Sequence, residues 1–288
     1  MSIMKRALCR CAAVLALLLP MAGAHAAITC NVTSSGFATA YSPTSGTTNV
    51  TQSSFTVSCT RGAAGDPTSV AYTVSVNNGL NANGINNRAT FGASTMRYDL
   101  YTDGGCTTQW KGNTTMPVGG GTITFAGTGT VTKTTTYWGC ATAGQTGLAA
   151  GTYTDVVVMT LSYGPNPQSS ATSTLPVSIA TPANCSLTQA PSPSPMVFNY
   201  IAFGAAAAAS ASYGVTCTNF LPYTMALDAT SGTLLGLSYT LALSAAAATG
   251  SGSQQTFTIT GTMAAGQAGT CATGSCTATQ TRTLTITY

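Results

Sequence analysis

The sequence predicts an all-β protein with two immunoglobulin-like antiparallel β-sandwiches in tandem, the second of which lacks its last strand. Short segments that alternate polar and apolar residues follow one another along the chain, and Gly, Asn and Pro separate them. Residues 27–288 are too many for one such sandwich and suit two domains of roughly 100 to 150 residues each. In addition, the same order of segments occurs twice.

The first 26 residues have the features of a secretory signal peptide. Basic residues lie between positions 5 and 10, an apolar run covers 12–19, and Ala-His-Ala at 24–26 is a small-residue cleavage site. The apolar run is too short to cross a bilayer, and no later run reaches the ~20 residues of a membrane helix. We expect a Sec-exported, soluble protein, not embedded in a membrane, whose mature chain begins at Ala27.

The mature chain is almost neutral and lacks most catalytic groups. The sequence has nine Lys and Arg and five Asp and Glu, and the signal contains three of the basic residues, which leaves 6 − 5 = +1. A net charge of +1 is too small to indicate the basic patch of a nucleic-acid-binding protein. His25 leaves with the signal and the chain has no glutamate, so histidine-based catalysis and histidine metal sites are excluded. We expect that the protein is not an enzyme and binds no cofactor. A pair of aspartates is the catalytic alternative that remains.

The cysteines indicate disulfides. Cys9 and Cys11 leave with the signal, and an even number remains, as in many exported proteins. Zinc is the alternative, but the mature chain has no CxxC. The remaining cysteines are Cys30, Cys59, Cys106, Cys140, Cys185, Cys217, Cys271 and Cys276. Their spacing alone does not choose among the possible pairings.

The elements of the first unit begin at Cys30. Phe37 and Tyr41 precede a turn, and a loop with the sequence Ala-Gly-Gln-Thr-Gly covers 143–147. The alternating segments that we expect to be strands are 55–60, 70–76, 96–101, 130–138 and 151–163.

The second unit repeats this order from Cys185. Its loop Ala-Gly-Gln-Ala-Gly at 265–269 matches the loop of the first unit. The expected strands are 213–218, 223–227, 237–243, 256–261 and a strand that ends at Tyr288. A repeat that covers nearly all of the mature chain predicts two sandwiches, at 27–180 and 181–288.

Residues 170–180 supply the last strand of the first sandwich. Leu175, Val177 and Ile179 fall on one face at period two. Burial of each contributes roughly 1.5 to 3 kcal/mol, so the sandwich should depend on this strand. Pro176 removes a ladder hydrogen bond, which predicts an edge strand or irregular pairing there.

The second unit has no corresponding segment. Its alternating strand at 281–288 ends at Tyr288, and nothing in the sequence follows to pair with it. We expect Leu284, Ile286 and Tyr288 to border an uncovered groove. An unpaired strand of this kind is a template for pairing with another chain.

Together these residues resemble a known family. The residues concerned in the first unit are Cys30, Cys59, Phe37, Tyr41, 98–101 (Tyr-Asp-Leu-Tyr), 143–145 (Ala-Gly-Gln) and 151–155 (Gly-Thr-Tyr-Thr-Asp). They resemble the spore coat protein U domain, as found in subunits of archaic (Csu-type) chaperone-usher pili. The second unit departs from the pattern at 276–280, where Gly-Thr-Tyr-Thr-Asp would be expected.

The resemblance implies assembly by donor-strand exchange, in which the N-terminal extension of one subunit completes the next. It implies three partners: an adjacent pilin subunit, a periplasmic chaperone and an outer-membrane usher. Only residues 27–29 precede Cys30, so the protein should receive a donor strand and have none to give. This places it at the end of a fibre on the cell surface, as a tip adhesin that supports attachment and biofilm formation. The alternative is a structural spore-coat or matrix subunit without a ligand.

A surface-binding site is expected on the long connection at 104–129. Its candidates are Trp110, Met116, Pro117 and Val118, because apolar side chains on a loop tip can contact a surface. Trp110 as a cap on the sandwich core is the alternative. If the strand direction is reversed, the candidates are Leu80, Ile85 and Leu148. The disulfide pairs that we expect are Cys30 with Cys59, Cys106 with Cys140, Cys185 with Cys217, and Cys271 with Cys276.

Overall fold

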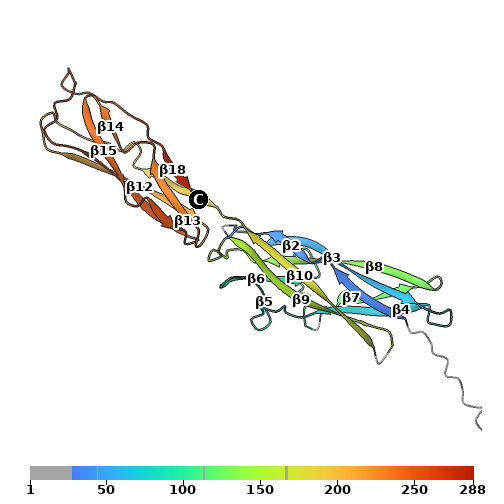
Figure 1. The fold of residues 1–288 in the computed structure, drawn as a ribbon. Coiled ribbons are helices and arrows are strands. Elements are labelled where there is room, and N and C mark those ends of the chain that lie inside the picture. Colours follow the sequence, from blue (N-terminus) through green and yellow to red (C-terminus); the bar gives the residue numbers. More distant parts are fainter. Residues whose placement is uncertain (1–27, 44, 113, 166–167) are drawn as a thin grey trace, which may run out of the picture.

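The structure is a computed structural model that describes residues 28–288 except 44, 113 and 166–167. All regular elements among these residues are strands, so the all-β class expected from the sequence is confirmed. No helix that could span a membrane occurs in this part of the chain. The strands form two groups that follow each other lengthwise (Figure 1). The expected signal, 1–26, lies outside the described residues.

The first unit comprises ten strands in two layers. They are β1 (Thr29–Ser34), β2 (Phe37–Ala40), β3 (Asn49–Arg61), β4 (Ser69–Val76), β5 (Asn87–Phe91), β6 (Ser94–Tyr101), β7 (Met116–Thr124), β8 (Gly129–Ala141), β9 (Gly151–Tyr163) and β10 (Ser169–Thr181). One layer has the order β1-β3-β8-β6-β5, and the other has β7-β4-β9-β10-β2. A single pair, Thr90 with Thr154, joins the layers. The first unit is therefore a sandwich closed along one side.

Strand β10 lies between two neighbours. It pairs antiparallel with β9 along all of its length, from Ser169 opposite Tyr163 to Thr181 opposite Gly151. On its other side, residues 177–180 pair with β2 in parallel. Leu175, Val177 and Ile179 are fully buried in the core.

Pro176 does not make β10 an edge strand. The register with β9 is unbroken at this residue, where Pro176 lies opposite Val156. The pairing with β2 begins only at Val177, which is the next residue. The missing N–H group is therefore accommodated at the end of the second ladder.

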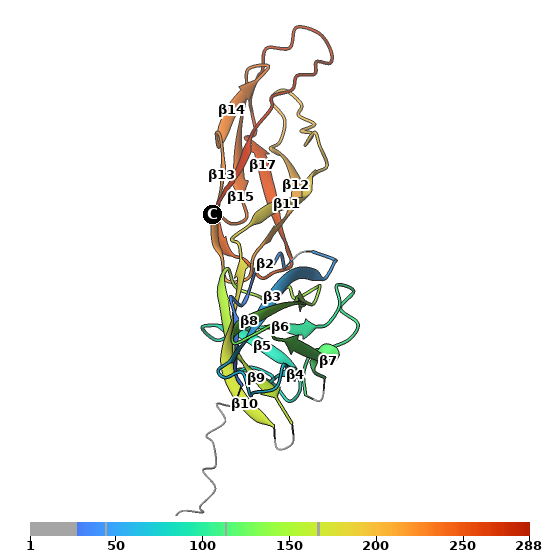
Figure 2. The same ribbon diagram turned by 90° about the vertical axis from the view of Figure 1, so that its right-hand side faces the viewer.

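The second unit comprises eight strands in two smaller sheets. They are β11 (Cys185–Ser192), β12 (Ala207–Cys217), β13 (Pro222–Leu227), β14 (Ser231–Leu234), β15 (Leu237–Leu243), β16 (Ala247–Thr249), β17 (Gln254–Met263) and β18 (Leu284–Thr287). The order is β11-β12-β17-β15-β14 in one sheet and β16-β13-β18 in the other. β18 runs to the C-terminus (Figure 1), which Figure 2 marks at one side of this unit.

Disulfides occupy matching places in the two units. Cys30–Cys59 joins β1 to β3, and Cys185–Cys217 joins β11 to β12. Cys106–Cys140 ties the chain after β6 to β8, and Cys271–Cys276 closes a small loop before β18. In both units the first strand is thus covalently fixed to its neighbour.

Candidate strand-acceptor site

Strand β18 has a partner on one side. It pairs antiparallel with β13, from Leu284 opposite Leu227 to Thr287 opposite Thr224. Among the described residues, its other edge pairs with nothing, since β18 ends the sheet. Main-chain N–H and C=O groups along such an edge are available to an added strand.

A shared glutamine contact shows which residues of the two units correspond. Gln145 accepts a hydrogen bond from the Arg97 N–H (2.7 Å) and donates to the Arg97 carbonyl (3.0 Å). Gln267 makes the same two bonds to Ser238, at 2.7 and 3.0 Å. Arg97 and Ser238 are therefore equivalent, and so are the residues that follow them, Tyr98 and Tyr239.

The two tyrosines align the last strands. The Tyr98 hydroxyl donates to Asp155 Oδ2 (2.7 Å), and the Tyr239 hydroxyl donates to Gln280 Oε1 (2.5 Å). Burial, together with the nearby charge of Asp155, raises the pKa of Tyr98 above the ordinary tyrosine value. Asp155 thus corresponds to Gln280. The matching residues four, six and eight positions further on are Met159 and Leu284, Leu161 and Ile286, and Tyr163 and Tyr288.

These corresponding residues differ in burial. Met159 and Leu161 are fully buried, whereas Leu284 and Ile286 are only partly buried. Tyr163 is 9% exposed, and Tyr288 is 57% exposed. In the first unit, β10 pairs with the edge of β9 and adds Leu175, Val177 and Ile179 to the core beside these residues. The partial burial of the second set shows what the same face looks like without such a strand.

The opposite wall of the open edge is the segment 196–200. Tyr200 corresponds to Tyr41, because the hydroxyl of each accepts a hydrogen bond from the N–H of its unit's glutamine, Gln267 (2.7 Å) and Gln145 (3.0 Å). Met196, Phe198 and Tyr200 alternate with exposed residues as in a strand, yet the segment forms no strand.

The first unit explains why this segment is irregular. Its counterpart, β2, is a strand because it pairs with β10. Met196, Phe198 and Tyr200 pack partly buried against the same core as Leu284 and Ile286. The site therefore lies between β18 and 196–200, and it fits a strand antiparallel to the first and parallel to the second.

Arg282 gives the site a positive charge that sequence reasoning missed. Arg282 lies two residues after Gln280. The corresponding residue in the first unit, two residues after Asp155, is the fully buried Val157. The Arg282 guanidinium donates to the Tyr239 hydroxyl (2.9 Å) and lies over the Tyr239 ring, 5.6 Å from the centroid. A second bond goes to the Ser231 carbonyl (2.8 Å), and Asp228 lies 3.9 Å away. An alignment of 276–288 with 151–163 by their polar and apolar positions could have shown that Arg282 replaces an apolar residue.

The expected surface-binding residues Trp110 and Met116 are not on the surface, so this prediction is corrected. Trp110 is 1% exposed, and its indole N–H donates to the Val74 carbonyl (3.1 Å). Its ring packs between Phe55 (5.2 Å) and Tyr137 (5.3 Å). A large aromatic side chain with a satisfied N–H is stable in such a core.

Met116 is buried because the expected loop at 104–129 contains β7. Met116 lies opposite Val74 on β4, which makes β7 an added edge strand of the layer. Pro117 is half-buried and Val118 is 73% exposed. Of the four candidates, Val118 is the one that solvent reaches freely.

The alternative surface-binding candidates also differ in their exposure to solvent. Leu148 is buried in the first core, while Leu80 and Ile85 are exposed on the β4–β5 connection. Asp155 holds that connection by accepting hydrogen bonds from the N–H groups of Leu80 (3.0 Å) and Asn81 (3.3 Å). No group of three potential metal ligands occurs in the described part of the chain.

Comparison with known families places the chain. A model of the Spore Coat Protein U domain matches residues 16–160, half of the chain, and the chain belongs to this family. No curated protein matches it.

Solved structures with a similar fold are distant. One is the complex of the CsuC chaperone with the CsuE tip adhesion subunit of archaic chaperone-usher Csu pili from Acinetobacter baumannii, at 14% identity and a TM-score of 0.45, covering 90% of this chain and 100% of that chain. Another is the CupB6 tip adhesin of Pseudomonas aeruginosa, at 10% identity and a TM-score of 0.42, covering 90% and 95%. The CooA pilin subunit of enterotoxigenic Escherichia coli has 14% identity and a TM-score of 0.33, covering 54% and 97%. At such distances, function has to be argued from the chain's own residues.

Proposed function

We propose that this protein is a subunit of a chaperone-usher fibre and accepts the donor strand of an adjacent pilin between β18 and residues 196–200. One observation carries the proposal. The first unit has a strand, β10, between the two elements whose counterparts in the second unit stand open. A donor strand would bury Leu284, Ile286 and the Met196–Phe198–Tyr200 row as β10 buries their counterparts.

The same strand supports a place at the end of the fibre. β10 directly precedes the second unit, where a pilin would carry its donor strand, and it pairs with β9 along all its length. It is therefore occupied within its own chain. We place the domain boundary at 180/181, with the first unit displayed beyond the last pilin as an adhesin domain and the second unit as the pilin domain.

Attachment would use exposed parts of the first unit. Its outer end is formed by the connections β3–β4 and β7–β8, and Arg61 holds the first of these through the carbonyls of Ala64 (2.5 Å) and Asp66 (2.7 Å). Val118 stands exposed on the added strand β7. A rigid, uncharged apolar group on an edge strand suits contact with a surface rather than catalysis.

Assembly of this kind implies a route through the periplasm. A periplasmic chaperone would cover the open edge of β18 in transit, since an unpaired edge with a half-covered core invites aggregation. An outer-membrane usher would then pass the subunit to the cell surface. The family to which the chain belongs is consistent with this route.

The test uses a donor peptide and the full-length mature protein. A peptide copying residues 169–181 should protect the β18 amides from hydrogen exchange, because the internal repeat makes it a surrogate donor. A matched peptide with aspartate in place of Val177 and Ile179 should not. The amides of Thr285 and Thr287 face β13, so the informative amides are those of Leu284 and Ile286, which face the open edge. If these two are already fully protected without any peptide, the open-edge proposal fails.

A further inference from the structure

The junction between the two units is built from short, polar contacts. Three residues, 182–184, lead from β10 to β11. The Asn219 side chain donates to the Gly147 carbonyl (2.8 Å), and Asn219 also bridges to Ala149. Gly252 lies so close to the Thr146 carbonyl that a side chain at this position would clash with its oxygen. The loop after β8 therefore meets the loops after β12 and β16.

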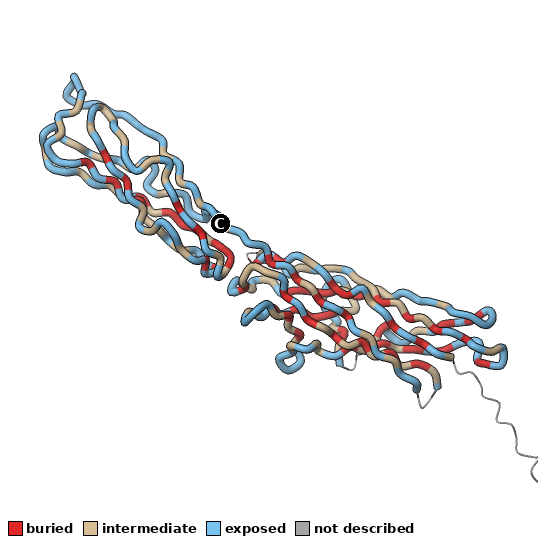
Figure 3. Tube along the Cα trace, viewed as in Figure 1, coloured by how far each residue is buried: buried red, intermediate tan, exposed pale blue. Residues whose placement is uncertain are grey.

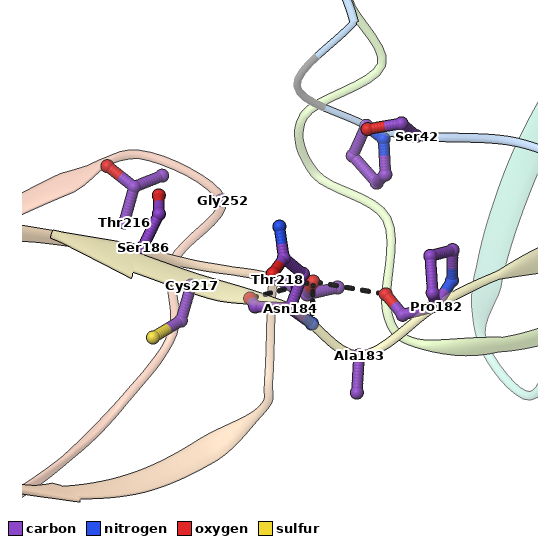
Figure 4. Close-up of a pocket in the computed structure, with 10 residues that line it drawn as sticks. Ser42, Pro182, Ala183, Asn184, Ser186, Thr216, Cys217, Thr218 and Gly252 are labelled. Carbon is purple, nitrogen blue, oxygen red and sulfur yellow. Dashed lines mark hydrogen bonds between the residues drawn. The ribbon is translucent and has the colours of Figure 1, made fainter. Parts of the chain in front are cut away.

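A cavity of about 230 Å³ lies in the same junction. Figure 4 shows Ser42 from the first unit on one side and Asn184 and Thr218 on the other. The Thr218 hydroxyl donates to the carbonyls of Pro182 (3.3 Å) and Asn184 (3.2 Å). The described side chains that line this cavity are small or polar.

The internal repeat makes this junction a template for the next one. β10 fills the first unit, leaves it at the pole formed by residues 41–43 and the loop after β8, and enters the second unit at once. A donor antiparallel to β18 would leave the second unit at the corresponding pole. That pole consists of the residues after Tyr200 and the loop after β17. The folded body of the donating subunit would contact this pole of the second unit, just as the second unit contacts the corresponding pole of the first.

The second unit differs at this pole by its apolar surface. Where Ser42 follows Tyr41, Ile201 follows Tyr200, and Ile201 is 80% exposed. Phe203 is 75% exposed and adopts a positive φ of 58°, which is unfavourable for a phenylalanine. Two bonds fix this turn: the Phe203 N–H donates to the Gln267 carbonyl (2.8 Å), and the Gly204 N–H donates to the Ile201 carbonyl (2.8 Å).

We propose that Ile201 and Phe203 form a docking surface for the body of the pilin that donates its strand to this protein. The inference rests on the proposed function. On the donating pilin, the contact surface is expected on the loops that correspond to those carrying Asn219 and Gly252 in this protein. Apolar side chains in those loops would pack against Ile201 and Phe203. A strained turn held by two backbone bonds, with two large apolar side chains in water, is stabilised when a partner covers it.

The neighbouring loop adds to this pole. In the first unit, five residues lie between Gln145 and the start of β9 at Gly151, whereas eight lie between Gln267 and the corresponding Cys276. The Cys271–Cys276 disulfide constrains the longer loop, and the Gln267 carbonyl at the start of this loop accepts the hydrogen bond from the Phe203 N–H. The docking surface is therefore tied to a constrained loop, which favours a defined rather than a sliding contact.

Photo-crosslinking in cells that assemble the fibre tests the inference on the full chain. A photo-crosslinking amino acid replaces Thr285 on β18, Phe203 on the turn, or Val118 in the first unit as the control. The expected result is that Thr285 and Phe203 crosslink to the same pilin, Thr285 to its N-terminal extension and Phe203 to its folded body, while Val118 does not.

The outcomes separate the inference from the proposed function. If Thr285 crosslinks to a pilin and Phe203 does not, or if Val118 crosslinks to it equally well, the docking surface is wrong and strand acceptance stands. If neither Thr285 nor Phe203 crosslinks to a pilin, the proposed function fails as well.

Affinity measurements give a second, independent readout. The double variant Ile201→Ser, Phe203→Gly keeps a residue that tolerates the positive φ, so the turn should still form. It should bind the isolated N-terminal extension of the crosslinked pilin as the wild type does. It should bind the whole pilin at least tenfold more weakly, because burial of two large apolar side chains is lost. Leu187→Ser, on the exposed face of β11, is the control, and equal loss in both variants would overturn the proposal.

Discussion

The two units share an order of strands but differ in how completely their cores are covered. Among the described residues, thirty hydrophobic residues are buried in the first core and three more pack half-buried against it. In the second core nine are buried and fifteen are half-buried. Figure 3 shows this contrast along the whole length of the molecule. Part of the difference coincides with β10, because the described residues of the second unit include no strand in the place that β10 takes in the first.

The largest effect should follow from breaking the strand that closes the first core. Val177→Asp places a carboxylate in a buried position directly opposite Asp155. An unpaired buried charge beside a second acid should destabilise the first unit by more than about 4 kcal/mol. Chemical denaturation followed by Trp fluorescence measures it, since both tryptophans lie in this unit. Thr174→Asp on the exposed face of β10 should cost little, and a similar loss there would refute the role of the buried face.

The next effect tests the interior of the closed unit. Trp110→Ala should lower the free energy of unfolding by about 3 to 5 kcal/mol, because it opens a cavity between Phe55 and Tyr137. Val118→Ser should change it by less than about 0.5 kcal/mol. Below the unfolding transition, Val118→Ser should reduce adsorption to a polystyrene surface and Trp110→Ala should not. If instead Trp110→Ala reduces adsorption and Val118→Ser does not, Trp110 takes part in the surface contact.

A matched pair of deletions sharpens the comparison directly. Leu161→Ala in the covered strand should cost about 3 kcal/mol, whereas Ile286→Ala at the corresponding open position should cost about 1 kcal/mol. With a saturating donor peptide, the cost of Ile286→Ala should rise toward that of Leu161→Ala. Thermal unfolding of each variant with and without peptide measures this. Equal costs without a donor would mean that the second core is already closed.

The smallest effect concerns pH in a loop of the first unit. A backbone hydrogen bond from Thr108 to Asp103, followed by bonds from Thr107 and Gly105, holds the pKa of Asp103 below its ordinary value. Since the pKa is lower in the folded state, the stabilisation is present above the ordinary pKa and is lost as pH falls through the folded value. The protection factors of the Thr107 and Thr108 amides, which correct for the slower intrinsic exchange at acidic pH, should therefore fall as the pH drops through the folded-state pKa of Asp103, and Asp103→Asn should remove that dependence.

Sequence reasoning found the elements that repeat within the chain. The Ala-Gly-Gln loops and the period-two pattern at 170–180 could be read directly, because each reports a local periodicity. Strand β7 was missed because Gly119 and Gly120 look like a loop, and the bulge between Tyr72 and Val74 in its pairing with β4 breaks the alternation. The sequence left Trp110 open between a loop tip and a cap on the core, because burial depends on neighbours far away in sequence, here Phe55 and Tyr137, and the structure agrees with the second alternative.

One side of the candidate site was predicted from the sequence. Leu284, Ile286 and Tyr288 were expected there from the alternating strand at 281–288, whereas its other wall at 196–200 was not expected. That segment is strand-like in its pattern and lacks a strand's pairing, so no local signal marks it as one side of a site. Arg282 was missed for a related reason: a charge in an alternating strand is normally expected on the outer face.

Strand β10 also determines how the molecule would bear tension. Residues 182–184 connect the second unit to the end of β10, so a pull on the second unit acts along the axis of that strand. Its hydrogen bonds to β9 and β2 lie across that axis and would be loaded together, in shear, rather than opened one at a time. The covalent link between the units is thus anchored in a strand of the closed core that is paired with β9 along its whole length, which suits a protein held at one end and pulled at the other.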